Sequence, residues 1–196
     1  MPNFEFFTEP YAHQREAFDA SADRQCFALF LDMGTGKTKV CLDTIACNFE
    51  SGKINFALIV APKGVIANWL GEIETHLPER IEREVVLWKP GLTKTKRAEL
   101  NDLYTESSKL KFLLMNVEAF STKKGVEVAE LFVDRFNAFM VVDESTTIKN
   151  RKAKRTKAIC DVGGGAVFRR ILTGSPVTKS PLDLYSQMDF LDSRIL

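Results

Sequence analysis

The clearest chemistry in this sequence lies in the segment Leu31–Thr38, which ends in Gly-Lys-Thr. Gly34 and Gly36 lack side chains, so backbone N–H groups can curl around an anion. Lys37 can reach the β- and γ-phosphates of a nucleotide, and the Thr38 hydroxyl can ligate Mg²⁺. An ordinary glycine-rich turn is the alternative. The predicted nucleotide-binding residues of this segment are Met33, Gly34, Thr35, Gly36, Lys37 and Thr38.

Two adjacent carboxylates, Asp143 and Glu144, follow an apolar run about 105 residues after the Gly-Lys-Thr segment. Carboxylates at the end of a buried strand are costly unless they meet a cation. In a nucleotide hydrolase, Asp143 would hold the Mg²⁺ shell together with Thr38, and Glu144 would polarise the attacking water. We therefore predict Lys37, Asp143 and Glu144 as catalytic residues. Taken alone, the acidic pair is also typical of a solvated strand end.

Polar residues follow three further apolar runs. Thr173 and Ser175 stand beside glycine and proline in a turn that could bond the carboxylates after a neighbouring strand, although a plain β-turn explains them as well. The segments after Ala61 and after Met115 would place polar groups at the same sheet edge, a natural place for a second ligand. We interpret Trp69, in the segment after Ala61, as a core residue or as part of that site.

Two features upstream and downstream complete the set of candidates. Gln14 offers one acceptor and two donors, which suits the edge of adenine. A basic tract follows the acidic pair, and it is either a solvated helix face or a contact for a nucleic-acid backbone. Because the whole chain has a net charge of only +1, nucleic-acid binding can be argued only from local patches. The tract consists of Lys149, Arg151, Lys152, Lys154, Arg155 and Lys157.

The elements that position these residues are six short apolar runs, each of four to six residues. Runs of this length without alternation are typical of strands buried on both faces. Between them lie helix-like spacings, for example Val65, Trp69 and Ile73, and later Leu182, Tyr185, Met188 and Leu191. The alternation predicts an α/β fold with a mostly parallel sheet and helices on both faces. The predicted strands are Phe27–Leu31, Phe56–Ala61, Val85–Trp88, Phe112–Met115, Phe139–Val142 and Phe168–Leu172.

Composition excludes several classes of protein. With 45% hydrophobic and 27% charged residues, the chain has an ordinary globular mixture. Its longest apolar run has nine residues, far from the roughly 20 of a membrane helix, and the start has no signal-peptide pattern. The four cysteines and two histidines have no zinc-site spacing. We expect no membrane span, no structural zinc and a reducing intracellular compartment, either cytoplasmic and nucleoid-associated or nuclear.

In order and spacing, these motifs resemble the first RecA-like lobe of superfamily-two helicases, and within it the Swi/Snf-type DNA translocases. In that family a residue other than glycine is normal at the position of Leu31. Thr146 stands where many relatives carry histidine. The trailing Ile-Lys-Asn and the Asn-Trp pair distinguish this family from DEAD-box RNA helicases. The similar segments are 10–14, 32–38, 59–63, 68–73, 143–150, 172–176 and 182–191.

The resemblance implies a single ATP-binding lobe over residues 1–196, with a second RecA-like lobe and its arginine finger absent from this chain. It implies ATP and Mg²⁺ as cofactors and duplex DNA as partner, with Gln14 reading adenine. Thr173 and Ser175 would couple the nucleotide site to the DNA side. The implied DNA contacts are Pro62, Lys63, Asn116 and Lys149.

Such a lobe would couple ATP hydrolysis to movement along DNA when joined to its partner lobe, and would be nearly inactive alone. One alternative is a stand-alone nucleotide- or DNA-binding module that docks to a partner protein. Another is a small-molecule P-loop kinase, which explains the acidic pair but not the Asn-Trp and Ile-Lys-Asn signals.

Overall fold

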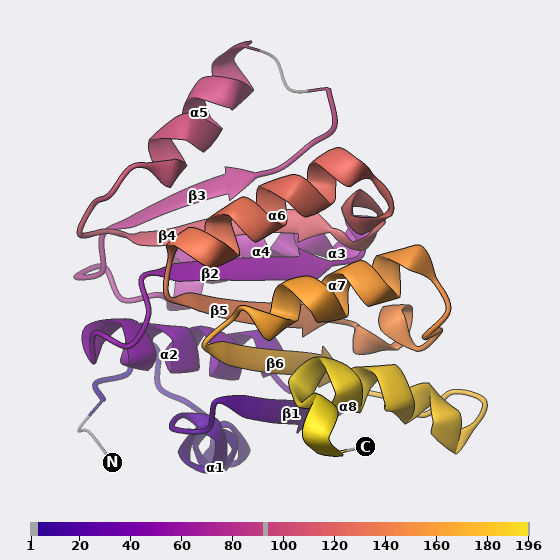
Figure 1. Ribbon diagram of the computed structural model, residues 1–196. Helices are drawn as coiled ribbons and strands as arrows, with labels where there is room; N and C mark the ends of the chain where they lie inside the picture. The colour runs from indigo at the N-terminus through magenta and orange to yellow at the C-terminus, as the bar shows by residue number, and fades with distance from the viewer. Residues whose placement is uncertain (1–3, 92–93, 196) are drawn as a thin grey trace.

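The structure is a computed structural model that describes residues 4–91 and 94–195. Six strands form one sheet in the order β1-β6-β5-β2-β4-β3, and every pairing is parallel (Figure 1). The predicted parallel α/β architecture and all six predicted strands are confirmed. The strands are β1 Cys26–Phe30, β2 Phe56–Ala61, β3 Arg83–Leu87, β4 Leu110–Asn116, β5 Ala138–Asp143 and β6 Phe168–Thr173.

Helices cover both faces of the sheet. Helices α1, α2 and α4 share one apolar core with the sheet, and α6, α7 and α8 share a second core on the opposite face (Figure 1). The strands contribute to both cores because alternate side chains point to opposite faces. The α-helices are α1 Ala12–Ser21, α2 Lys37–Glu50, α3 Lys63–Ile66, α4 Asn68–His76, α5 Lys94–Tyr104, α6 Lys123–Arg135, α7 Lys154–Gly164 and α8 Tyr185–Leu191. Short 3₁₀ segments are η1 Val117–Ser121, η2 Ser145–Ile148, η3 Pro181–Leu184 and η4 Ser193–Ile195.

The two predicted helical faces differ in outcome. Trp69 and Ile73 are buried on α4, as the spacing predicts, but the chain is divided into α3 and α4 at Ala67. The prediction of one continuous face starting at Leu182 is wrong, because Leu182 lies in η3 and is 75% exposed. Pro181 begins this 3₁₀ turn, and Ser180 caps it by accepting a hydrogen bond from the Leu182 N–H. The helix proper, α8, starts only at Tyr185.

Parallel pairing brings three strand ends to one edge of the sheet. Strand β6 lies between β1 and β5, with Phe30 beside Thr173 and Leu172 beside Asp143. The loop after β1, the turn after β6 and the acidic pair after β5 are therefore neighbours. This is the carboxyl edge of the sheet, where open α/β folds bind their ligands.

No described helix is long and apolar enough to cross a lipid bilayer.

Candidate nucleotide site and nucleic-acid groove

The predicted phosphate loop connects β1 to α2. Gly34 and Gly36 have φ values of 77° and 85°, in the left-handed region that side chains rarely adopt. A Cβ at Gly36 would also collide with the Gln14 side-chain amide. Glycine at position 36 is therefore favoured by the backbone, and any side chain there would displace Gln14.

Lys37 is folded back over this loop. Its Nζ donates to the carbonyls of Leu31 and Asp32, both at 2.9 Å. Thr35 braces the same turn by donating from Oγ1 to the Asp32 carbonyl at 2.7 Å. The ammonium group is thus held at the mouth of the loop by half-exposed or exposed carbonyls, which an incoming phosphate could replace as partners.

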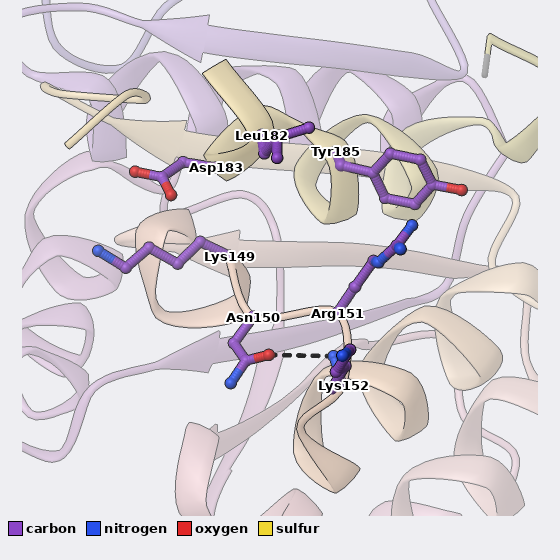
Figure 2. Close-up of a pocket in the computed structure, with 7 residues that line it drawn as sticks. All are labelled: Lys149, Asn150, Arg151, Lys152, Leu182, Asp183 and Tyr185. Carbon is purple, nitrogen blue, oxygen red and sulfur yellow. Dashed lines mark hydrogen bonds between the residues drawn. The ribbon is translucent and has the colours of Figure 1, made fainter. Parts of the chain in front are cut away.

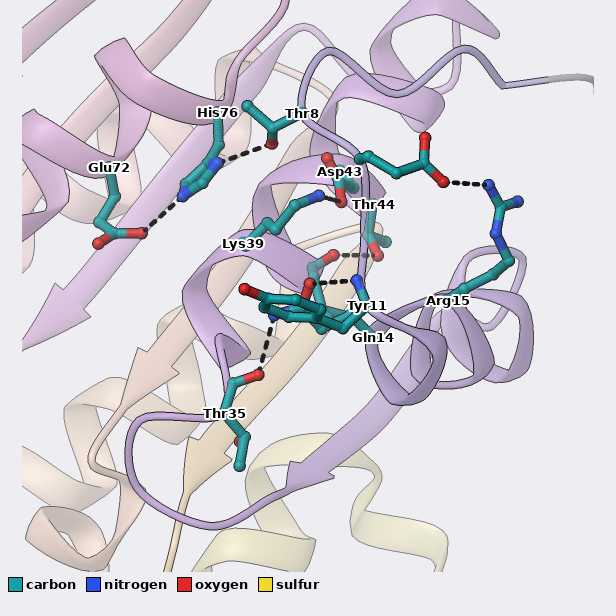
Figure 3. A network of polar contacts seen from close by, with 12 residues as sticks. Thr8, Tyr11, Gln14, Arg15, Thr35, Lys39, Asp43, Thr44, Glu72 and His76 are labelled. Carbon is teal, nitrogen blue, oxygen red and sulfur yellow. Dashed lines mark hydrogen bonds and ion pairs between the residues drawn. The ribbon is translucent and has the colours of Figure 1, made fainter.

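Gln14 lies against the loop from the first turn of α1 (Figure 3). Its Nε2 donates to the Thr35 carbonyl at 3.0 Å, and its Oε1 accepts from the Tyr11 N–H at 3.0 Å. The ring Nε2 of His13 meets the same Thr35 carbonyl at 2.9 Å. One Nε2 hydrogen of Gln14 is left to offer to a base, so its role in reading adenine stays a prediction alongside the observed bracing role.

The acidic pair is held in an unusual backbone. Glu144 has φ 48° and ψ 57°, and it is the single non-glycine residue with positive φ in the described parts of the chain. Strain of this kind costs about 1–3 kcal/mol and is concentrated at functional sites. Asp143 lies at the carboxyl edge as the last residue of β5, and Glu144 links it to η2.

The pKa values of both carboxylates are affected by the lysine of the phosphate loop. The pKa of Asp143 is raised above its ordinary value, because the effect of burial outweighs three lowering effects. These are the hydrogen bonds from Trp69 and from the Glu144 N–H, and the charge of Lys37. Burial and the neighbouring Asp143 raise the pKa of Glu144, and Lys37 again opposes this. The parallel pairing of β1, β6 and β5 brings the phosphate loop and the acidic pair to one edge, and the charge of Lys37 lowers the pKa of both carboxylates there.

The turn after β6 packs against the phosphate loop. A Cβ on Gly174 would approach the Met33 nitrogen to 3.3 Å and the Leu31 carbonyl to 3.5 Å. The buried Thr173 Oγ1 accepts from the N–H of Ser175 at 3.2 Å, and Ser175 itself is exposed. Thr173 and Ser175 thus form a self-bonded turn beside the loop, and their coupling role stays a prediction.

Two sets of side-chain contacts at this site were not predicted from the sequence. Trp69 donates from its indole nitrogen to Asp143 Oδ2 at 2.9 Å. Ser145 donates to Gln187 Oε1 at 2.6 Å, and Gln187 Nε2 donates to the Pro176 carbonyl at 2.8 Å. The Asn-Trp pair and the serine beside the acidic pair were visible signals for two of these residues, but no spacing pointed to Gln187.

The oxygen donors at this edge fit a magnesium nucleotide. A hydroxyl and a carboxylate are hard ligands, and Mg²⁺ is commonly bound through one or two such groups plus substrate phosphates. Among residues 4–91 and 94–195, no cluster of three or more His, Cys, Asp or Glu side chains could hold a metal. Thr38 and Asp143 would supply the protein ligands of a Mg²⁺ ion that binds together with the nucleotide.

A groove of about 830 Å³ lies along the other half of the carboxyl edge, beyond β2, β4 and β3. It brings together two of the predicted DNA contacts, Lys63 and Asn116, and Pro62 precedes Lys63 as the N-cap of α3. The Asn116 side chain accepts from the Ala119 N–H at 2.8 Å, so it also caps η1. The groove is lined by Lys63, Ile66, Ala67, Leu87, Trp88, Lys89, Pro90, Asn116 and Glu118.

Lys149 lies apart from this groove, in a smaller pocket of about 240 Å³ between η2 and η3 (Figure 2). Its Nζ donates to Thr178 Oγ1 at 2.6 Å, and Arg151 stacks over the Tyr185 ring at 5.0 Å. Arg155 pairs with Glu118 at 4.0 Å. Three cations of the basic tract are thus engaged by neighbours, whereas Lys152, Lys154 and Lys157 are exposed to solvent.

Comparison with known proteins decides the family. The family described as the SNF2-related domain matches residues 13–196. The chain belongs to the SNF2-related family. The resemblance of the sequence motifs to the first RecA-like lobe of Swi/Snf-type helicases is thereby confirmed.

Curated SNF2-related proteins are similar over most of this chain. TATA-binding protein-associated factor mot1 of Schizosaccharomyces pombe is 31% identical over 172 residues, covering 82% of this chain and 8% of mot1. Protein CHROMATIN REMODELING 24 of Arabidopsis thaliana is 27% identical over 191 residues, covering 92% of this chain and 17% of that protein. ATP-dependent helicase ULS1 of Saccharomyces cerevisiae is 28% identical over 187 residues, covering 82% and 11%. The chain therefore spans well under a quarter of the length of these SNF2-related relatives.

Solved structures agree on the fold. The Sulfolobus solfataricus SWI2/SNF2 ATPase core in complex with dsDNA superposes with a TM-score of 0.74 at 19% identity, covering 98% of this chain and 37% of that one. The UvsW helicase from Bacteriophage T4 gives a TM-score of 0.66 at 14% identity, covering 94% and 58%. Both likenesses support the RecA-like fold of this SNF2-related lobe.

Proposed function

We propose that this chain is the N-terminal ATP-binding lobe of a DNA-dependent SNF2-family ATPase. Joined to a second RecA-like lobe, it would couple ATP hydrolysis to movement along duplex DNA. The observation that carries the proposal is that the phosphate loop after β1 and the acidic pair after β5 meet at one sheet edge, on either side of β6. This arrangement matches what phosphoryl transfer to water needs, namely a cation for the phosphates and a carboxylate for the nucleophile.

Each residue of the site would have a distinct role in ATP binding and hydrolysis. The backbone N–H groups of the phosphate loop and the N-terminus of α2 bind the phosphates, and Lys37 moves from the Leu31 and Asp32 carbonyls onto them. Glu144 orients water, while Asp143, held by Trp69, faces the metal position. When bound, Mg²⁺ would neutralise part of the negative charge on the phosphates.

Two observations support duplex DNA as the partner. The groove brings Lys63 and Asn116 together, and the Sulfolobus solfataricus SWI2/SNF2 ATPase core, which has the same fold, was solved in complex with dsDNA. We place the sugar-phosphate backbone along this groove and Pro62. Lys149 lies outside the groove, and its contact would be made from the separate pocket that it lines.

The first experiment measures ATP binding and hydrolysis by the 196-residue chain, with and without duplex DNA. We expect ATP to bind and turnover to stay very slow, because an arginine finger contributes about 10³–10⁵ in rate and would come from the second lobe. Rapid DNA-stimulated turnover by this chain alone would contradict the two-lobe proposal.

The second experiment measures duplex DNA affinity across salt concentrations for Lys63→Ala. Loss of one phosphate contact lowers the slope of log affinity against log salt by about 0.9. Lys109→Ala is the matched control, because Lys109 lies at the opposite edge of the sheet, just before β4. Equal slopes for Lys63→Ala and the unmodified chain would remove Lys63 from the DNA contact.

A further inference from the structure

Trp69 and Asp143 are far apart in the sequence and meet in the interior. The indole Nε1 donates to Asp143 Oδ2 at 2.9 Å, and the two residues are 1% and 5% exposed. An indole has a single N–H, so this bond uses all of its donor capacity. Asp143 Oδ1 accepts from the Glu144 N–H at 2.8 Å. The orientation of the carboxylate is therefore set by one donor from its own backbone and one from α4.

The short helix α3, which directly precedes α4, forms a wall of the groove. Ile66 and Ala67 line the groove, and Ala67 is both the C-cap of α3 and the N-cap of α4. Ala67 has φ −68° and ψ −27°, so the chain stays helical on the way to Trp69 two positions later. A displacement of the groove wall would be transmitted to the indole through this short helical connection.

We propose that Trp69 is a positioning residue that orients Asp143 for the metal and reports occupancy of the groove to the nucleotide site. The inference rests on the proposed function. It adds a physical link between the two halves of the carboxyl edge, from Lys63 and Ile66 in the groove to the carboxylate after β5.

The second tryptophan of the chain provides a matched control. Trp88 is also buried, at 3% exposure, and it lines the same groove from the end of β3. Its indole Nε1 has no hydrogen-bond partner in the part of the chain that the structure describes. Trp69 and Trp88 therefore differ in the one interaction that the proposal invokes, while both contribute a large buried ring.

The first test compares Trp69→Phe with Trp88→Phe in ADP binding with and without Mg²⁺. Phenylalanine keeps most of the buried ring and removes the N–H. Loss of a residue that orients a metal ligand typically costs about 10–100-fold in metal affinity. We expect Trp69→Phe to weaken Mg²⁺-dependent ADP binding at least about tenfold, with Mg²⁺-free binding and the thermal midpoint close to those of Trp88→Phe.

Three outcomes are distinguishable. Unchanged Mg²⁺-dependent binding in Trp69→Phe would overturn the positioning role. An equal loss with and without Mg²⁺ would also overturn it, because that result describes general damage to the site. If the unmodified chain binds no nucleotide at all, the proposed function fails and the inference fails with it.

The second test follows the indole N–H signal of Trp69 by NMR. The chain has two tryptophans, so its ¹H–¹⁵N spectrum holds two indole signals, and the Trp88→Phe spectrum assigns the one that belongs to Trp69. We expect addition of a short DNA duplex to the unmodified chain to shift the Trp69 signal. A Trp69 signal that stays in place while fluorescence anisotropy shows the duplex bound would overturn the link between groove and nucleotide site.

Discussion

At both edges of the sheet a cation donates to backbone carbonyls, but the two arrangements differ in burial. At the carboxyl edge, half-buried Lys37 donates hydrogen bonds to the carbonyls of Leu31 and Asp32. At the amino edge, Arg170 near the start of β6 is 0% exposed and donates to four carbonyls. These acceptors belong to Ser21, Arg24, Gln25 and Arg169.

Lys111, near the start of β4, repeats the pattern of the amino edge. It is buried, and its Nζ donates to the carbonyls of Leu103 and Thr105, which closes the connection from α5. Arg170 and Lys111 thus fasten loops from buried positions that water and ligands do not reach. The cation of the carboxyl edge instead donates to carbonyls of residues that are half-exposed or exposed. The same edge holds the strained residue Glu144. The comparison separates residues that maintain the fold from residues available for chemistry.

The largest effect is expected at the amino edge. Arg170→Ala removes donors to four carbonyls and leaves a cavity beside Phe139, over whose ring the guanidinium lies at 5.0 Å. We expect a loss of about 4 kcal/mol in the free energy of unfolding, measured by urea titration. Arg170→Lys should recover part of it. A loss below about 1 kcal/mol would show that the carbonyls find other partners.

Lys37→Ala should greatly weaken ATP binding while leaving the stability of the fold nearly unchanged, the reverse of what we expect for Arg170→Ala. The loss of charged hydrogen bonds to phosphate is expected to weaken ATP binding about 100-fold or more, as measured by calorimetry. The urea midpoint should hardly move, because the partners of Lys37 are loop carbonyls that water can solvate. Lys53→Ala, an exposed lysine paired with Asp23, is the control. Unchanged nucleotide affinity in Lys37→Ala would count against the whole site.

A third effect lies beneath the carboxyl edge, where buried Lys39 and Asp43 pair on α2 at 2.7 Å. Burial raises the pKa of Asp43 from 3.8 to about 6 despite the bond from Lys39. The folded state therefore holds a proton that the unfolded state releases, so this group lowers stability as pH rises from 3.8 to about 6.

The corresponding measurement is the free energy of unfolding at several pH values for Asp43→Asn. The contribution of Asp43 to the slope approaches about 1.4 kcal/mol per pH unit inside that window, and the variant should lack it. Parallel pH profiles for the variant and the unmodified chain would show that the carboxyl is not protonated in the folded state.

The smallest effect is expected at Glu144. Asparagine adopts the left-handed conformation more readily than glutamate, and it also removes the negative charge beside Asp143. Glu144→Asn should raise the free energy of unfolding by about 1 kcal/mol in a urea titration. A destabilised variant would mean that Glu144 contributes to the fold rather than storing strain for function.

The sequence predicted the strands and the phosphate loop because both depend on local patterns. Runs such as Phe56–Ala61 are apolar throughout, and Gly-Lys-Thr carries its chemistry in adjacent residues. The bond between Trp69 and Asp143 was not predictable, since it depends on how α3 and α4 meet at Ala67. In the sequence, Arg170 is a charged residue within an apolar run. Its role could not be predicted, because its carbonyl partners come together only when the loops pack.

The exposed start of η3 shows the limit of periodicity. Leu182 has the right spacing for a helical face with Tyr185, but Pro181 imposes a tighter turn and leaves the leucine in solvent. Likewise, the bond from Ser145 to Gln187 joins the segment after the acidic pair to α8 through side chains 42 positions apart. Contacts of this kind follow from tertiary packing, which a single sequence does not display.

The most direct measurement is paramagnetic broadening of backbone amide signals by Mn²⁺ bound with ADP. If the phosphate loop and the acidic pair hold one metal–nucleotide unit, the signals of Gly36–Thr38 and of Asp143 and Glu144 should broaden together, at the same Mn²⁺ concentration. The signals of Lys111 and Arg170, at the opposite edge, should remain sharp. Broadening confined to one of the two segments would contradict a shared site.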